Sequence, residues 1–231
     1  MSHFFRFWLW LTTGMVTREW VAIHRKHHAR CEMEGDPHSP IVWLENVHNR
    51  YLRALALVWF VVWEGVRKYV RESKNKETLE RYGKGTPDDW VERNVYSRFP
   101  KCGVAIMFIV NVVCLGVKYG VLLWLIQMIW IPIFAAGIIN GVGHFLGYRN
   151  FESGHRKTGV IDSSHNIIPW GILIGGEELH NNHHHAEPSP KLSVRWFEFD
   201  IGWMYIRIFE TLGLVTHIRR DRIETTTQNA G

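Results

Sequence analysis

The longest apolar stretch of the chain runs from Val104 to Ile139 and contains only three strongly polar residues. At a rise of about 1.5 Å per residue, its roughly 36 residues would form about 54 Å of helix, close to two crossings of a ~30 Å hydrocarbon core. Lys118 to Gly120 lies near the middle and is typical of a turn. The pattern therefore predicts a transmembrane helical hairpin, with limbs at about 103–117 and 121–141. A buried helical hairpin in a soluble protein is the alternative interpretation.

The segments on either side of this hairpin have helical patterns that are too short or too polar to cross a bilayer. Residues 4–30 predict one helix with an apolar first half, and residues 53–70 predict an amphipathic helix in the membrane interface. Residues 71–101 are charged and predict a cytosolic connector with a small helix. Residues 194–214 predict a second amphipathic helix, and the polar residues 215–231 predict a disordered tail.

The distribution of tryptophan and of charge supports a membrane setting. The chain has 12 tryptophans, many of them beside apolar runs, and tryptophan is enriched at membrane interfaces. Lysine and arginine outnumber aspartate and glutamate by 27 to 22, and the basic residues cluster on both flanks of the hairpin. A two-pass hairpin returns both flanks to the same side, and positive flanks place that side in the cytoplasm. Nucleic acid is not an expected partner, because no basic stripe alternates with stacking aromatic residues.

The pattern His-x-x-His-His occurs twice, at 24–28 and at 180–184. On a helix, residues three and four apart share a face, so each pattern would present three imidazoles to one side. A third element places Asn140 and His144 four residues apart, where the second limb leaves the membrane. Neutral imidazole is the commonest metal ligand and suits iron, zinc and copper, and seven histidines exceed the needs of one tetrahedral site. We therefore expect two metal ions, with the candidate ligands His24, His27, His28, His144, His180, His183 and His184.

Residues beside the two patterns are candidates for a second layer around the metals. Ligating histidines commonly donate their other ring N–H to a carboxylate. The acidic residues placed to accept it are Glu19, Glu32, Asp36, Glu177 and Glu178. His38 and His185 are expected either beside the ligands or facing solvent. The other histidines are isolated in the sequence, and we expect them to be surface or helix-capping residues: His3, His48, His155, His165 and His217.

Three segments carry the clustered histidines: WVAIHRKHHARCEMEGDPHSP, NGVGHFLGYRNF and GGEELHNNHHHAEP. They resemble the membrane fatty-acid desaturases, most closely the acyl-CoA (delta-9 type) branch, and the similarity extends over about residues 4–214. The family's second histidine box, HRxHH followed by DPH, matches at His24, His27, His28 and 36–38. Its Asn-x-x-x-His element with a following Gly-Tyr-Arg matches at Asn140, His144 and 147–149. Its third box, HNxHH, matches at His180, His183 and His184.

The resemblance implies an oxygen-dependent desaturation that introduces a cis double bond into a long-chain fatty acyl substrate, either acyl-CoA or acyl-lipid. It implies two iron ions held by imidazoles, with Asn140 reaching its iron through a water molecule. Electrons would come from a separate donor of the ferredoxin, rubredoxin or cytochrome b5 type with its reductase. The family makes Trp20 a candidate wall of the acyl tunnel, although an interfacial tryptophan is an equal alternative. Arg149 is a candidate for the phosphates of coenzyme A or of a membrane lipid, with a solvated basic surface as the alternative.

The expected fold is an all-α integral membrane protein with a single domain over residues 1–231. A transmembrane helical hairpin at about 103–141 and amphipathic interfacial helices would hold the histidine-rich metal site on the cytoplasmic side. The multi-pass protein is expected in the bacterial inner membrane, with the endoplasmic reticulum as the alternative, and membrane lipid is an expected partner.

The chain departs from the family pattern at its start. The family has a first histidine box, with two further histidines, upstream of the second box, and that position falls before Met1. The chain is therefore expected to be the C-terminal two-thirds of the family fold, either through a misplaced start codon or as a truncated polypeptide. Three functions stay open: a desaturase, a hydroxylase of the same superfamily, and a catalytically incomplete homologue. The HRxHH, DPH and GYR details favour desaturation.

Overall fold

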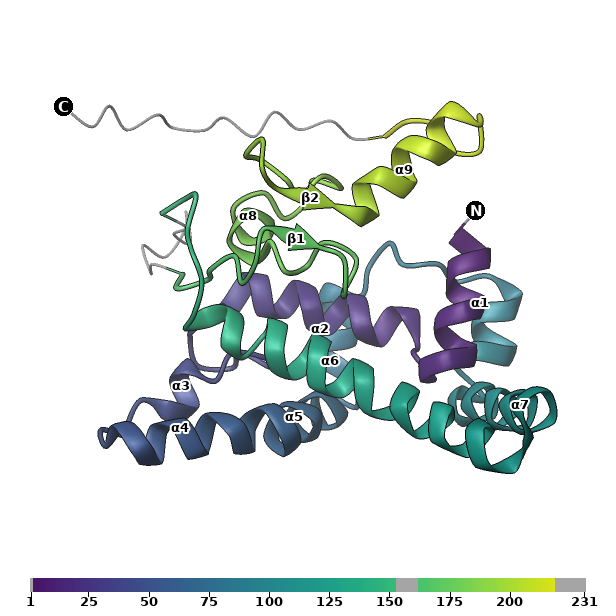
Figure 1. The fold of residues 1–231 in the computed structure, drawn as a ribbon, viewed down its shortest axis with the longest axis horizontal. Helices are drawn as coiled ribbons and strands as arrows, with labels where there is room; N and C mark the ends of the chain where they lie inside the picture. Colours follow the sequence, from purple (N-terminus) through teal and green to yellow (C-terminus); the bar gives the residue numbers. More distant parts are fainter. Residues whose placement is uncertain (1, 153–161, 219–231) are drawn as a thin grey trace.

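The computed structural model describes residues 2–152 and 162–218 and shows a mostly helical protein (Figure 1). The elements of its first half are α1 (Ser2–Thr13), α2 (Thr17–Arg30), α3 (Ile41–Leu44), α4 (Arg50–Trp59), the π-helical turn η1 (Phe60–Glu64), α5 (Gly65–Glu72), α6 (Lys76–Tyr82) and the π-helical turn η2 (Glu92–Tyr96). The second half contains α7 (Pro100–Ile131), the π-helix η3 (Pro132–Ile139), the 3-10 turn η4 (Val142–His144), α8 (His180–His185) and α9 (Ile201–Thr211). Two short strands, β1 (Trp170–Gly171) and β2 (Phe199–Asp200), pair in parallel.

The prediction of one continuous helix over residues 4–30 is wrong, because the chain bends between α1 and α2. Gly14 has φ of +69°, a left-handed conformation that glycine adopts at no steric cost. A Cβ atom at this position would lie 3.0 Å from the carbonyl oxygen of Pro100. The backbone N–H of Gly14 donates to the carbonyl of Trp10 and closes the last turn of α1. α2 therefore leaves in a new direction and enters the middle of the molecule (Figure 1).

α1 is held against the connector that precedes α7 by buried charges. The guanidinium of Arg6, only 7% exposed, donates to the carboxylates of Asp89 and Glu92. The indole N–H of Trp10 donates to the carbonyl of Phe99 at 3.0 Å. The predicted small helix of the connector is α6. Since a buried ion pair is costly to break, the connector is a fixed part of the fold rather than a loose linker.

The long apolar segment is helical and bends once in the middle. It is the one helical segment among the described residues that is long and apolar enough to cross a membrane, spanning Pro100–His144 with mean hydropathy 2.2. The bend lies at Gly116, with φ of +73° and ψ of +166°, rather than at the expected position 118–120. Gly120 serves a different purpose, since a Cβ atom there would lie 2.5 Å from the carbonyl oxygen of Asn111. Glycine at 120 thus permits close contact between the two limbs.

Polar side chains join the two limbs of this segment. The amide of Asn111 donates to the Gln127 side chain at 2.9 Å, and the Trp124 indole donates to the carbonyl of Val104 at 2.9 Å. The aromatic rings of Phe108 and Trp124 meet edge to face with centroids 5.3 Å apart. Amides inside an apolar segment need partners, and here each limb supplies the partner for the other.

The amphipathic segment before the connector is helical from α4 through α5. It exposes large apolar side chains, including Leu55, Val58 and Trp63. The final amphipathic helix is shorter than predicted, because residues 194–200 form a loop that ends in β2. The Glu198 carboxylate accepts backbone N–H groups of this loop, and Asp200 caps α9 by accepting the N–H of Trp203 at 2.9 Å. Most of the predicted tail, residues 219–231, lies outside the described residues.

Candidate metal centre

Two helices carry six of the seven candidate ligands to the middle of the molecule. α2 contributes His24, His27 and His28, and α8 lies beside its C-terminal half (Figure 1). α8 has only six residues and contributes His180, His183 and His184. So short a helix has little stability of its own, and its position must come from tertiary contacts.

Two asparagines on the opposite face of α8 fix its position. The amide oxygen of Asn181 accepts the backbone N–H groups of Asn150 and Phe151 at 2.8 and 2.9 Å. The amide of Asn182 donates to the carbonyl of Leu192 and to the Glu198 carboxylate, each at 2.9 Å. Both asparagines are fully buried, so this polar network determines which face of α8 presents its histidines.

The first histidine cluster consists of His24, His28 and His183. Their Nε2 atoms lie 3.0 Å apart for His24–His183, 3.1 Å for His24–His28 and 2.9 Å for His28–His183. Three neutral imidazoles cannot satisfy three mutual contacts with hydrogen bonds, because each Nε2 is either a donor or an acceptor and cannot be both. One cation bound by all three nitrogens satisfies them together, so the donor set fits a metal ion.

The second histidine cluster consists of His27, His144, His180 and His184. The Nε2 atoms of His27 and His184 lie 3.3 Å apart, and those of His144 and His180 lie 3.2 Å apart. Gly143 allows this approach, since a Cβ atom there would lie 3.1 Å from the His180 ring. His27, His144 and His184 group with the Cys31 thiol as potential metal ligands, and His180 adjoins them through His144. This donor set again fits a metal ion, and imidazole suits iron.

The two clusters adjoin. His27 and His28 are neighbours in α2 but belong to different clusters, and the same is true of His183 and His184 in α8. The ring centroids of His28 and His184 are 4.4 Å apart. Two metal ions held by these clusters would therefore be close neighbours.

Carboxylates hold the rings of the second cluster from outside. Asp36 lies 2.8 Å from Nδ1 of His27, Glu32 lies 2.8 Å from Nδ1 of His144, and Asp162 lies 2.6 Å from Nδ1 of His184. Such contacts fix the tautomer that leaves Nε2 available to a metal. Glu32 has φ of +58°, and its backbone N–H donates to Asp36. The role of Asp162 could not be predicted from the sequence, because this residue lies in a loop at no regular spacing from either histidine pattern.

Burial lowers the pKa of five of the seven clustered histidines. Burial lowers the pKa of His24 to about 3 and that of His183 to about 4. It also lowers the pKa of His180 well below the ordinary value. His27 differs: burial lowers its pKa, but the Asp36 carboxylate outweighs this and leaves the pKa above the ordinary value. Neutral imidazole is the form that ligates metals, so the environment favours metal binding at neutral pH.

The other sequence-predicted residues occupy varied positions. Asn140 is buried, and its amide donates to the carbonyl of Ala135 at 2.8 Å. His38 is fully buried beside the rings of His27 and Trp20, and neither of its nitrogens has a hydrogen-bond partner among the described residues. The Glu178 carboxylate accepts the backbone N–H groups of residues 172–174 rather than contacting a histidine. Glu177 lies 3.9 Å from Nε2 of His183.

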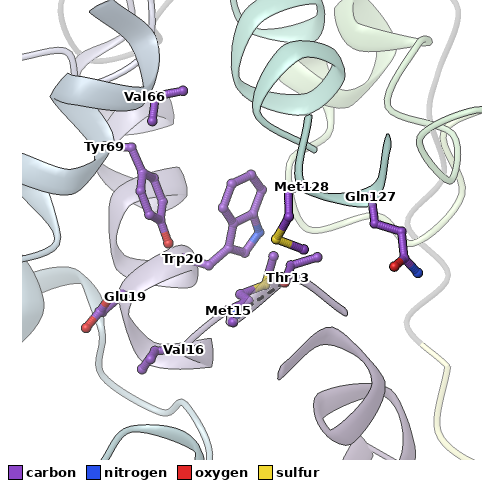
Figure 2. Close-up of a pocket in the computed structure, with 10 residues that line it drawn as sticks. Thr13, Met15, Val16, Glu19, Trp20, Val66, Tyr69, Gln127 and Met128 are labelled. Atoms are coloured by element: carbon purple, nitrogen blue, oxygen red, sulfur yellow. Dashed lines mark hydrogen bonds between the residues drawn. The ribbon is translucent and has the colours of Figure 1, made fainter. Parts of the chain in front are cut away.

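Trp20 connects the first cluster to a pocket. Its indole stacks on the His24 ring with centroids 5.9 Å apart and planes 13° from parallel. Figure 2 shows the indole at the centre of this pocket, facing Tyr69 on one side and Met128 on the other. The pocket is lined by Thr13, Gly14, Met15, Val16, Glu19, Trp20, Val66, Tyr69, Gln127 and Met128. The bend between α1 and α2 thus opens beside the candidate metal centre.

Arg149 is not at this pocket. Its guanidinium donates to the carbonyls of Phe151 and Asp162. It therefore holds the loop that supplies the Asp162 carboxylate to His184. In the described structure, its contacts are those of a positioning residue.

Comparison with known proteins agrees with this geometry. The family model for fatty acid desaturases matches residues 1–207. The chain is 25% identical over 207 residues to sn-1 stearoyl-lipid 9-desaturase from Anabaena variabilis, covering 87% of this chain and 64% of that one. It is 27% identical over 213 residues to Delta-9 desaturase-like 4 protein from Arabidopsis thaliana, covering 87% and 59%. No solved structure matches significantly.

Adjoining histidine clusters beside a long apolar helix are typical of membrane-associated metal-binding proteins. The chain belongs to the fatty acid desaturase family. It spans about three-fifths of the length of these two relatives, as their coverage of 64% and 59% shows.

Proposed function

We propose that the chain carries the reaction centre of an oxygen-dependent desaturase, which introduces a cis double bond into a long-chain fatty acyl substrate. The observation that carries this proposal is the convergence of seven imidazole Nε2 atoms into two adjoining clusters beside an apolar pocket. We assign one iron ion to each cluster. When bound, the irons supply the redox chemistry that activates O2 for removal of hydrogens from two adjacent methylenes.

The residues of the chain prepare this chemistry in two ways. Asp36, Glu32 and Asp162 hold three rings by Nδ1, so that each Nε2 faces inward. Trp20 and Tyr69 form an apolar wall next to His24, which suits an alkyl chain and excludes water from it. We assign Asn140 to the second cluster through a water molecule, because it is buried only four residues from His144.

The setting of the reaction is part of the proposal. The limbs of the apolar segment form a transmembrane hairpin, with the histidine clusters on the cytoplasmic side. The relatives' names include a stearoyl-lipid desaturase and an acyl-lipid desaturase, so a lipid-linked acyl chain and acyl-CoA are the two substrates to compare. Electrons come from a separate donor of the ferredoxin, rubredoxin or cytochrome b5 type.

The test is product analysis in a desaturase-deficient host. The 231-residue chain and a version extended upstream to the next in-frame start are expressed, and fatty acids are profiled by gas chromatography. Unsaturated acyl chains from either version, absent in its His27→Ala variant, support the proposal. Hydroxylated acyl chains would replace desaturation with hydroxylation. A metal-loaded protein that yields neither product in either version would show a non-catalytic homologue.

A further inference from the structure

The pocket beside the first histidine cluster follows one face of α2. His24, Trp20 and Val16 are spaced four residues apart, so they lie in a row along this face. The backbone N–H of Trp20 donates to the carbonyl of Val16 at 3.1 Å, and both residues line the pocket. At a rise of about 1.5 Å per residue, the row is about 12 Å long. It leads from the candidate metal centre to the bend between α1 and α2.

The bend blocks the far end of this row. A Cβ atom at Gly14 would lie 3.0 Å from the carbonyl oxygen of Pro100 and 3.8 Å from the side chain of Val104. The start of α7 therefore packs directly behind the bend. An alkyl chain that lies along the row from His24 cannot continue straight past this point.

Two methionines contact the pocket at its blocked end. Met15 belongs to the bend, and Met128 belongs to the second limb of α7. Figure 2 shows both side chains directed into the pocket beside the indole of Trp20, and they reach it from different walls. A methionine side chain is flexible and apolar, so it suits contact with the methyl end of an alkyl chain.

The polar groups of the lining do not compete for this end. The Thr13 hydroxyl donates to the carbonyl of Leu9 at 2.6 Å, and the Gln127 amide oxygen accepts from Asn111 at 2.9 Å. Glu19 is the charged residue of the lining, and Figure 2 shows its carboxylate pointing away from the indole. The blocked end is therefore apolar, which favours the methyl end of a chain over its polar head.

We infer that Met15 and Met128 form the end wall of the acyl pocket and select the length of the alkyl chain. The inference rests on the pocket of the proposed function. The methyl end of the chain meets the two methionines, so they set how many carbons can lie beyond the metal centre. The preferred substrate class is an unbranched acyl chain whose methyl end just reaches this wall.

The test measures the binding of saturated fatty acids of increasing length to the purified full chain in detergent, without an electron donor, so that no turnover occurs. A terminal bromine on each fatty acid quenches nearby indoles, and Trp20→Phe identifies the signal of Trp20. The result is the ratio of the Kd of a variant to that of the wild type at each length. Partitioning of the fatty acid into detergent cancels in this ratio, because the same ligand is compared.

Two substitutions at Met128 should have opposite effects on long chains. Met128→Ala opens the end wall, so long chains should bind more tightly by about fourfold for each additional methylene admitted. Met128→Trp fills the end and should weaken the binding of long chains by at least about tenfold. Both variants should bind short chains as the wild type does. Ile129→Ala is the matched control, because Ile129 is 54% exposed and lies next to Met128 outside the lining, and its ratio should stay at one for every length.

A variant in the bend provides a second, independent position. Met15→Ala should act in the same direction as Met128→Ala. Because a damaged fold would weaken binding at every length, opposite changes confined to long chains identify an end wall. Ratios that do not depend on chain length at either position would overturn the inference. If the length-dependent changes appear but product analysis finds no unsaturated chain, the inference stands and the proposed reaction fails. A wild type that binds no fatty acid would refute both the acyl pocket and its end wall.

Discussion

Seven imidazole rings at the centre of the molecule share one orientation. Every Nε2 atom lies within 3.3 Å of another, whereas the Nδ1 atoms of His27, His144 and His184 face carboxylates. At the scale of single residues, this orientation matters more than the number of histidines. At His27, His144 and His184 it selects the tautomer that keeps the inward nitrogen free of a proton.

Removing one ring should empty one site and spare the other. His183→Ala deletes a member of the first cluster, and His27→Ala deletes a member of the second. Each variant is expected to retain about half of the wild-type iron and to lose turnover. Iron is measured by elemental analysis of the purified protein. The exposed His48 provides the control, and His48→Ala should keep the full iron content. Full activity in His27→Ala or His183→Ala would refute the two-cluster centre.

The metal-free chain should lose stability as the pH falls from 7 to 5. His24 and His183 have pKa values of about 3 and about 4 in the folded chain, against about 6.5 when unfolded. Between about pH 4 and 6.5 the unfolded state thus binds more protons, so the free energy of unfolding falls with pH. Each such histidine contributes up to about 1.4 kcal/mol per pH unit. His27 acts in the opposite direction because its pKa is raised.

The measurement is the thermal unfolding midpoint of chelator-treated protein, followed by tryptophan fluorescence. His183→Ala should show a shallower dependence on pH than the wild type, because one of the buried histidines is gone. A midpoint that does not change between pH 7 and 5 would contradict the burial of neutral imidazoles.

At the scale of elements, spacing in the sequence predicted which histidines come together, but not how they are distributed between the two clusters. Helical geometry groups His24, His27 and His28 on one side of α2. Which of them meets His183 depends on the placement of α8, and that placement comes from Asn181 and Asn182 through contacts with distant loops. Asp162 could not be predicted for the same reason.

The sequence pattern also could not predict where the helices bend. Gly116 and Gly120 are both plausible turn residues, but only the structure shows that Gly116 bends the chain and Gly120 gives room to Asn111. Gly14 lies in a pattern that otherwise continues as helix. The glycine is visible in the local sequence, but the contact with Pro100 that requires a glycine there is made by a distant part of the chain.

Gly14→Ala should destabilise the protein more than Gly85→Ala. Both glycines have similar positive φ, +69° and +77°, so both variants incur the left-handed strain of about 1–2 kcal/mol. Only at Gly14 would the new Cβ atom also meet a backbone oxygen, that of Pro100 at 3.0 Å. Thermal unfolding of the two variants measures the difference. Equal midpoints would show that the α1–α2 bend tolerates a side chain.

At the scale of the whole molecule, apolar and polar elements are segregated. α4 and α5 lie on the opposite side of α2 from α8 in the view of Figure 1. The long segment exposes Val113 and Val117, which are 77% and 70% accessible, and only 20% of its most apolar window is buried. Exposed apolar surface of this kind marks contact with a membrane or a partner. The sequence predicted this segregation, because it depends on long runs of residues rather than on single contacts.

Two native cysteines can test the transmembrane hairpin. Cys102 and Cys114 are both exposed, one near the start of α7 and the other beside the bend at Gly116. In the proposed hairpin, Cys102 lies at the cytoplasmic end of the first limb and Cys114 lies beside the turn. A membrane-impermeant maleimide should therefore label Cys114 only from the outer face of intact cells and Cys102 only from the cytoplasmic face.

Variants with one of the two cysteines replaced by serine identify the labelled position. Cys31 is buried and should not react with the maleimide in either variant. Labelling of Cys102 and Cys114 from the same face would show that the segment does not cross the bilayer. Labelling with the faces exchanged would reverse the proposed orientation.

The division of neighbouring histidines between the clusters has a mechanical consequence. His27 and His28 move together because they share the backbone of α2, and so do His183 and His184 in α8. Any sliding or tilting of α8 against α2 therefore changes the size of both metal positions at once. Movement of η4, which carries His144, or rotation of a single side chain can alter one position alone. Through α2 and α8, however, a change in the bonding at either site is transmitted to the other across less than one turn of helix.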